Sequence, residues 1–218
     1  MYNSDGGIML HNVLNEILNL PHFSNAKGEH ETKIQDLLIS GGFSSSTIEE
    51  QGLRKKDIRK CLVDNNIQPN VFIAQPCGSQ SFPDFIVSDE NGVVRYIECK
   101  SSKDDKIVWN SGRPKSDAIY IVSSGKHNKQ TLVLGSDLWD DTEYQLVLEA
   151  FEKMKEIQKK YYALLENMGS KLRPYCREMF NDGYKIYGHK DRELRVQKVF
   201  NSLKENSGEF IRDIKAVL

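Results

Sequence analysis

Apolar residues near the amino terminus recur every three or four positions, which is typical of an amphipathic helix. The first such segment covers roughly 10–19, and Leu20 before Pro21 ends it, because a residue preceding proline is held out of the helical region. A second helix is predicted over roughly 29–40, where a glycine pair follows. A basic and helical stretch is predicted at about 54–63.

The middle of the chain changes to short runs of β-branched and aromatic residues bounded by turn residues, which indicates strands. Glu90-Asn91-Gly92 is a typical hairpin loop between two of these runs. The predicted strands cover 71–74, 83–89, 93–100, 117–122 and 131–134.

From about residue 141 the pattern is helical again. Residues 142–168 lack glycine and proline, and their apolar positions alternate in steps of three and four, as in a heptad repeat. We interpret this seam as the core face of a long helix packed on the sheet or on the final helices, with a symmetric dimer contact as the alternative. Further helices are predicted at about 191–205 and 209–217. The order of helices, sheet and helices indicates an α/β or α+β class with a covered central sheet.

Composition narrows the function classes. The 218 residues suit one domain, or one domain with a small appendage. A net charge of −1, from 30 basic and 31 acidic residues, excludes binding to polyanions by bulk charge but permits a local basic surface. We expect no membrane span, no signal peptide, no zinc site among the four cysteines, and reduced thiols in the cytoplasm.

Two acidic residues and a lysine have the spacing of a catalytic site. Asp84 lies near the start of one predicted strand, and Glu98 and Lys100 lie two apart near the end of the next, so the latter two share one face. A hairpin brings these strand ends together. Carboxylate oxygens suit Mg²⁺, to which the Cys99 carbonyl can add a ligand. Lys100 would then position the attacking water, help it lose a proton, or stabilise charge on phosphorus.

These residues resemble the PD-(D/E)xK nuclease superfamily, and more narrowly type II restriction endonucleases. Pro83-Asp84 is similar to the PD element of that superfamily, and Glu98-Cys99-Lys100 to its ExK element. The resemblance implies that Asp84 and Glu98 are metal ligands and that Lys100 is the catalytic lysine. It covers about 75–126 and includes the flanking runs Gly78-Ser79-Gln80, Ser101-Ser102-Lys103, Trp109-Asn110-Ser111-Gly112 and Ser123-Ser124-Gly125.

The resemblance also implies a fold and an activity. The expected fold is α/β, with a central mixed β-sheet flanked by helices and a mainly helical carboxyl-terminal part. Residues 1–218 would form a single nuclease domain with a catalytic core at about 29–135 and a helical subregion at about 141–218. The implied activity is sequence-specific, Mg²⁺-dependent cleavage of double-stranded DNA, by a possible homodimer, with a companion DNA methyltransferase that protects the host.

The family core carries an acidic residue on a helix before the sheet, for which Glu31 is our candidate and Glu29 the alternative. The family usually crosses from the ExK strand to the next strand through a helix, whereas 101–118 reads here as a loop. Gln80 can orient the phosphate or the water, or can simply bond to the loop backbone.

Several residues are candidates for DNA contact, because cations suit phosphates and asparagine can pair with adenine. For each, an ordinary solvated surface position is the alternative, and for the tryptophan the alternative is a buried anchor of its loop. The candidates are Lys103, Trp109, Asn110, Arg113, Lys115, Lys126, Arg173 and Lys190.

Two other functions compete with a restriction enzyme. The first is a structure-specific nuclease of the same superfamily that acts on junctions, repair intermediates or transposon ends. The second is a non-catalytic DNA- or protein-binding module whose hairpin merely carries salt-bridged charges.

Overall fold

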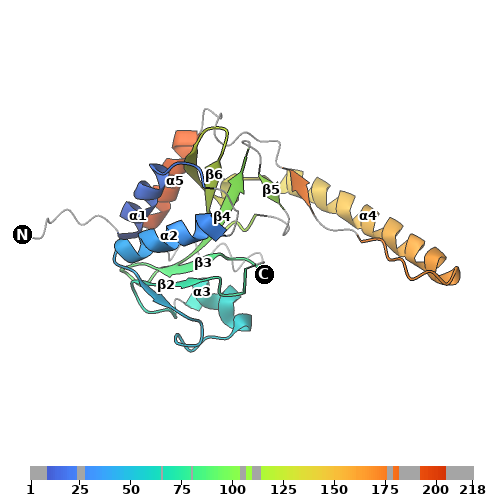
Figure 1. Cartoon of the computed structure of the whole chain (residues 1–218), viewed down its shortest axis with the longest axis horizontal. Coiled ribbons are helices and arrows are strands. Elements are labelled where there is room, and N and C mark those ends of the chain that lie inside the picture. Colours follow the sequence, from blue (N-terminus) through green and yellow to red (C-terminus); the bar gives the residue numbers. More distant parts are fainter. Residues whose placement is uncertain are drawn as a thin grey trace, which may run out of the picture.

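A mixed six-stranded sheet with the order β1-β2-β3-β4-β6-β7 lies at the centre of the computed structural model (Figure 1). The structure describes residues 9–23, 28–64, 66–79, 81–103, 107–109, 114–175, 179–181 and 192–204. The strands of the sheet are β1 (Ser44–Ser46), β2 (Val71–Ala74), β3 (Phe85–Ser88), β4 (Val94–Ser102), β6 (Ala118–Ser124) and β7 (Lys129–Leu134). The predicted central mixed sheet of an α/β protein is therefore confirmed.

Helices cover both faces of this sheet. Helices α1, α2 and α5 pack on one face, and η2 and α3 pack on the other. The helices are α1 (Met9–Leu18), α2 (Glu29–Ser40), the 3₁₀ turn η2 (Lys55–Lys60), α3 (Cys61–Asp64), the 3₁₀ turn η3 (Gly135–Asp137), α4 (Asp141–Asn167) and α5 (Arg192–Lys204).

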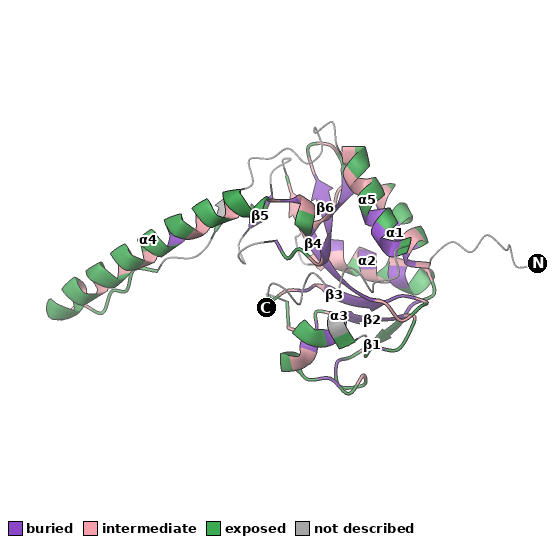
Figure 2. Cartoon of the chain, turned by 180° about the vertical axis from the view of Figure 1, so that it is seen from behind, coloured by how far each residue is buried: buried purple, intermediate pink, exposed green. Residues whose placement is uncertain are grey.

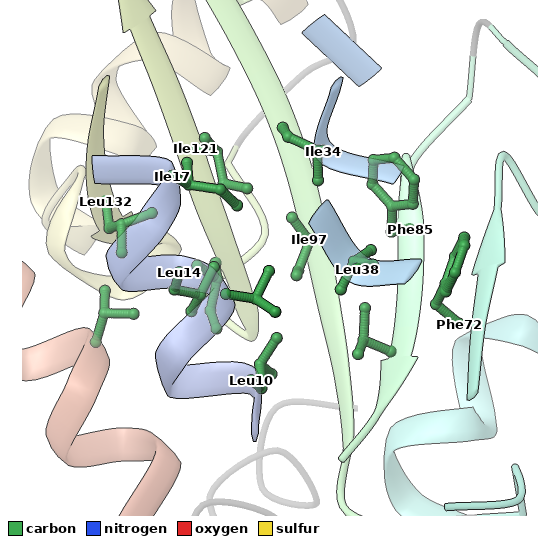
Figure 3. Close-up of a cluster of buried hydrophobic side chains, with 14 of the residues drawn as sticks. Leu10, Leu14, Ile17, Ile34, Leu38, Phe72, Phe85, Ile97, Ile121 and Leu132 are labelled. Atoms are coloured by element: carbon green, nitrogen blue, oxygen red, sulfur yellow. The ribbon is translucent and has the colours of Figure 1, made fainter. Parts of the chain in front are cut away.

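Side-chain alternation along the strands divides the core into two layers. In β4, Ile97 and Cys99 face the layer of α1 and α2, whereas Tyr96 faces the layer of η2 and α3. Figure 3 shows α1 and α2 packed over the face of the sheet that carries Ile97. Their apolar stripes meet the strands through Leu10, Leu14, Ile17, Ile34, Leu38, Phe72, Phe85, Ile97, Ile121 and Leu132.

The predicted hairpin forms between β3 and β4. The Gly92 N–H donates to the Asp89 carbonyl at 2.9 Å, and Gly92 adopts φ 76°, a conformation that glycine tolerates without strain. The Asp89 carboxylate also accepts bonds from two backbone N–H groups of the turn. The resulting antiparallel register pairs Phe85 with Ile97. This register decides which residues meet at the open end of the hairpin.

The connection from β4 to the parallel strand β6 contains no helix among its described residues, as the sequence predicts. It contains the short strand β5 (Val108–Trp109), which pairs with β8 (Phe180–Asn181) near the base of α4. Neither of these two-residue strands was predicted.

Helix α4 is continuous as predicted, but the interpretation of its seam as a core face is wrong over most of its length. It projects away from the sheet, and its surface is largely exposed (Figure 2). Phe151 is its only buried described side chain, whereas Met154, Tyr161 and Met168 are 42%, 53% and 80% exposed. The reason is length: 27 residues of helix span about 40 Å, more than the roughly 30 Å of the nine-residue strand β4.

Smaller differences concern secondary structure. Strand β1 is an unpredicted parallel neighbour of β2, and the basic stretch begins as a 3₁₀ helix rather than an α-helix. Helix α5 matches the prediction at 191–205, and the helix expected at 209–217 lies outside the described residues. Over the ranges that the structure describes, no helix is long and apolar enough to cross a membrane.

The position of α2 gives a test of this fold. Leu38 is fully buried and its neighbour Ile39 is 52% exposed. We expect Leu38→Ala to lower the free energy of unfolding by about 2–5 kcal/mol, because the removed methyl groups leave a cavity. Ile39→Ala should change it by no more than about 0.5 kcal/mol. Denaturant unfolding measures both, and equal losses would contradict the placement of α2.

Candidate functional site

The open end of the β3–β4 hairpin brings Asp84, Glu98 and Lys100 together. Asp84 directly precedes β3, and its Oδ2 accepts a hydrogen bond of 2.7 Å from the backbone N–H of Cys99. The Lys100 Nζ donates to the Glu98 Oε1, also at 2.7 Å. Alternation along β4 places Glu98 and Lys100 on one face of the sheet, and the register of the hairpin brings Asp84 beside them.

These charges are largely removed from water. The side chains of Glu98 and Lys100 are only 9% and 15% exposed. Burial, and then the negative charge of Glu98, raise the pKa of the Asp84 carboxyl to about 7, although the Cys99 N–H and Lys100 oppose the shift. Within the described chain, the buried Oε2 of Glu98 has no hydrogen-bond partner. The site therefore holds more negative charge than one lysine compensates.

Glu31 adds to this negative charge from the first turn of α2. Its charge raises the pKa of both Asp84 and Cys99, after burial and the nearer charges. Its buried Oε2 also has no hydrogen-bond partner among the described residues. The alternative candidate, Glu29, is exposed. Of the two acidic residues proposed from the sequence, the structure thus brings Glu31 toward Asp84.

Cys99 presents its backbone, not its thiol, to this site. The thiol is buried in the layer of α1 and α2, where burial raises its pKa well above the usual value, so it stays protonated. In an antiparallel ladder the N–H and C=O of one residue point to the same side. Because the Cys99 N–H bonds to Asp84, its carbonyl oxygen also points toward Asp84. That this carbonyl is a metal ligand stays a prediction.

A wall of aromatic rings borders Lys100. The Lys100 Nζ lies 6.0 Å from the centroid of the Trp109 ring, at the outer limit of a cation–π contact. Trp109 is 2% exposed and packs edge-on against Tyr120 and Trp139, with ring centroids 5.3 and 6.1 Å away. It is therefore an anchor of its loop, and its proposed contact with DNA is wrong because the ring is buried.

The predicted DNA-contacting cations are spread over several places. Lys103 and Lys126 are exposed at the ends of β4 and β6, where the Gly125 N–H bonds to the Ser102 carbonyl. Lys115 is exposed just before β6. Arg173 follows the last residue of α4, and its guanidinium contacts the Tyr162 ring and pairs with Glu166 of that helix. The remaining candidates, Gln80, Asn110, Arg113 and Lys190, lie outside the described residues.

The donor set fits Mg²⁺ better than a metal that needs many protein ligands. In the part of the chain that the structure describes, no group of three or more His, Cys, Asp or Glu side chains is arranged to hold a metal ion. Mg²⁺ is commonly bound through one or two carboxylates and keeps several waters. Asp84 and Glu98 supply two carboxylates. The Oε2 of Glu98 is buried without a hydrogen-bond partner among the described residues, and a bound cation would stabilise its charge.

No model of a known protein family, no curated protein and no solved structure matches the chain. The geometry of this site is therefore what supports a functional conclusion.

Tyr120 belongs to the site but was not predicted. It pairs in register with Glu98, and its hydroxyl accepts a bond of 2.7 Å from the Lys115 N–H. Burial, and then the charges of Glu98, Asp117 and Asp84, raise its pKa. The sequence predicts that Tyr120 lies on a strand. The loop before that strand does not determine its register with β4, so the pairing of Tyr120 with Glu98 could not be predicted.

A polar network that was also not predicted lies on the other face of the sheet. The buried Ser123 Oγ bonds with the His22 Nδ1 at 2.8 Å and accepts from the Phe23 N–H at 2.9 Å. Gln130 donates through its Nε2 to this hydroxyl at 3.0 Å and to the Pro21 carbonyl at 2.6 Å. These bonds attach the segment ahead of α2, and hence Glu31, to β6 and β7.

The raised pKa of Asp84 predicts an unusual pH dependence. The folded protein binds this proton more tightly than the unfolded chain, so the stabilisation is complete below about pH 4 and is lost as the pH rises through 7. Asp84→Asn removes the buried charge but keeps an acceptor for Cys99. In EDTA, we expect its midpoint of thermal unfolding to exceed that of the wild type at pH 8 by about 2–4 °C or more, and by less at pH 5.

Asp36→Asn on the exposed surface of α2 is the matched control, and its effect should not follow this pH trend. A difference between Asp84→Asn and wild type that is independent of pH would contradict the raised pKa.

Proposed function

We propose that the chain is a sequence-specific, Mg²⁺-dependent endodeoxyribonuclease that hydrolyses phosphodiester bonds of duplex DNA, as type II restriction enzymes do. The observation that carries this proposal is the meeting of Asp84, Glu98 and Lys100 at the open end of one hairpin. The six-stranded mixed sheet, with α2 before it and the hairpin at its centre, agrees with a restriction-endonuclease-like fold. Such an enzyme would act in the cytoplasm beside a companion methyltransferase.

Each residue of the site has a role in this proposal. Asp84 and Glu98 would hold the metal, together with the carbonyl of Cys99. Bound Mg²⁺ would polarise the phosphate and lower the pKa of a coordinated water. The bond from the Cys99 N–H fixes the orientation of the Asp84 carboxylate. Glu31, whose charge raises the pKa of Asp84, would accept a hydrogen bond from water that approaches Asp84.

Lys100 is the cation of the site. Its ammonium neutralises one Glu98 oxygen, and three N–H donors let it also bond a phosphate oxygen or the attacking water. The aromatic wall of Trp109 and Tyr120 limits the access of bulk water on this side. Exclusion of water strengthens the electrostatic effect of the Lys100 ammonium on the negative charge that develops at the phosphate in the transition state.

Cleavage of unmethylated phage DNA with Mg²⁺ tests the proposal. We expect discrete fragments with one sequence at every end. Asp84→Ala and Lys100→Ala should lower the cleavage rate at least about 100-fold, because each removes a group that stabilises the transition state. The exposed residues Asp36 and Lys159 give matched controls, and Asp36→Ala and Lys159→Ala should cut at the wild-type rate.

Other outcomes would replace the proposal. Nicking confined to branched DNA would identify a structure-specific nuclease of the same superfamily. Duplex binding without cleavage by any preparation would identify a non-catalytic module, and persistent cutting by Asp84→Ala protein would refute the site.

The proposal extends to a homodimer formed through α4. One side of α4 carries exposed apolar residues at steps of three and four, namely Ala150, Met154, Ile157, Tyr161, Leu164 and Met168. Residues 141–152 contain four acidic and no basic residues, whereas 153–167 contain four lysines and two glutamates. Antiparallel pairing with a second copy would place the acidic half against the basic half in one two-fold contact.

Sedimentation of the full chain tests the dimer. We expect the wild type to sediment as a dimer and Ile157→Glu/Leu164→Glu protein as a monomer, because buried glutamates lack partners. Ala163→Glu, an exposed position on the opposite side of α4, should leave the dimer intact. A monomeric wild type at micromolar concentration would exclude this contact.

A further inference from the structure

The segment 54–60, with the sequence RKKDIRK, concentrates positive charge on a surface next to the site. It has five basic residues and one acidic residue, in a chain with a net charge of −1. Ile58 is its buried member, and its carbonyl accepts a hydrogen bond from the Tyr96 hydroxyl. A 3₁₀ helix has three residues per turn, so Lys56, Arg59 and Lys60 lie on the sides of η2 away from Ile58. Lys55 lies one turn before Ile58 and is also exposed.

Most of these cations form no ion pair with an acidic residue that the structure describes. Arg54 bonds to Asp57 at 3.1 Å. Lys55, Lys56, Arg59 and Lys60 are all exposed and form no ion pair within the described part of the chain. Two of the four lysines on α4 differ in this respect, since Lys153 and Lys155 pair with glutamates of their own helix. The four residues Lys55, Lys56, Arg59 and Lys60 are called the η2 patch below.

The η2 patch lies on the sheet face that carries Glu98 and Lys100. Ile58 and Cys61 pack in the same core layer as Tyr96 and Tyr120, and Tyr120 pairs in register with Glu98. Burial raises the pKa of the Cys77 thiol, and the positive charges of Lys55 and Arg59 oppose that shift. Both cations are therefore near the loop that runs from β2 to Asp84.

We infer that the η2 patch binds the phosphodiester backbone of duplex nucleic acid on one flank of the site formed by Asp84, Glu98 and Lys100. This inference rests on the proposed function. Six residues of 3₁₀ helix are about 12 Å long, and successive phosphates of one strand are about 3.4 Å apart along the duplex axis. The patch therefore spans several phosphates and binds them without reading the sequence.

The salt dependence of duplex binding tests this inference. Asp84→Asn protein in EDTA leaves the DNA uncut, and Lys55→Gln/Arg59→Gln is added to it. Because two cations no longer neutralise phosphates, log Kd should change less steeply with log salt, by about 2 units of slope. Affinity at 50 mM salt should fall at least about tenfold. The thermal midpoint should not change, because both side chains are exposed.

Lys159→Gln/Lys204→Gln removes the same charge from exposed positions of α4 and α5 and is the matched control. Lys159 lies on the side of α4 opposite to the apolar stripe of the proposed dimer contact, so this variant should leave the slope unchanged. If the slope fell equally in both double variants, duplex binding would depend only on the net charge of the protein, and the inference would be overturned. An unchanged slope in the patch variant would also overturn it, while the proposed function would stand. Cleavage and duplex binding absent from every preparation would instead refute the proposed function. If the patch variant lost its affinity for polyglutamate but kept its affinity for DNA, the patch would be a site for an acidic protein. That result would overturn the inference.

Discussion

The antiparallel pairing of Phe85 with Ile97 is the constraint on which the site depends. Shifting this register by one residue would turn every side chain of one strand to the opposite face. Apolar residues of β4 are buried under α1 and α2, so such a shift would expose part of the core and bury charges in its place. Hydrophobic burial on one face of the hairpin thereby holds the acidic and basic groups of the other face in position.

This arrangement buries carboxylates at the open end of the hairpin, and burial of these charges lowers the stability of the protein when no cation is bound. Glu98 lies almost fully buried with one oxygen unpartnered in the described structure, and Asp84 retains a proton far above its ordinary pKa. Buried carboxylates without partners destabilise a protein unless a cation binds them. Such groups cluster at functional sites, where the lost stability is compensated by ligand binding. The η2 patch shows the complementary arrangement, with exposed cations that form no ion pair among the described residues around one buried isoleucine.

Much of the site follows from local pattern. The period of two along 93–100 places Glu98 and Lys100 on one face, and the turn residues 90–92 specify the hairpin that brings Asp84 to them. The bounds of α1 and α2 follow equally from apolar spacing and from the glycine pair after residue 40. These features depend on neighbours in sequence, which is why one chain suffices to predict them.

The remaining features depend on partners that are distant in sequence. The pairing of Glu98 with Tyr120 is set by a long connection whose length does not determine register. Strand β1 consists of three serines, which carry no strand signal of their own, and forms because β2 offers a free edge. Apolar spacing identified one side of α4 as apolar, but spacing alone does not say what covers it. Burial of Trp109 depends on rings supplied by β6 and by residue 139.

The bonds of Ser123 and Gln130 to residues 21–23 join parts of the chain about a hundred residues apart. During synthesis the amino-terminal helices leave the ribosome long before β6 and β7 exist, so their docking site is completed last. Until then α1 lacks its contacts with β7, and the segment ahead of α2 lacks its bonds to Ser123 and Gln130. The attachment of the segment ahead of α2 to the sheet is therefore completed late, when most of the chain is already made, and a product truncated before β6 would lack it.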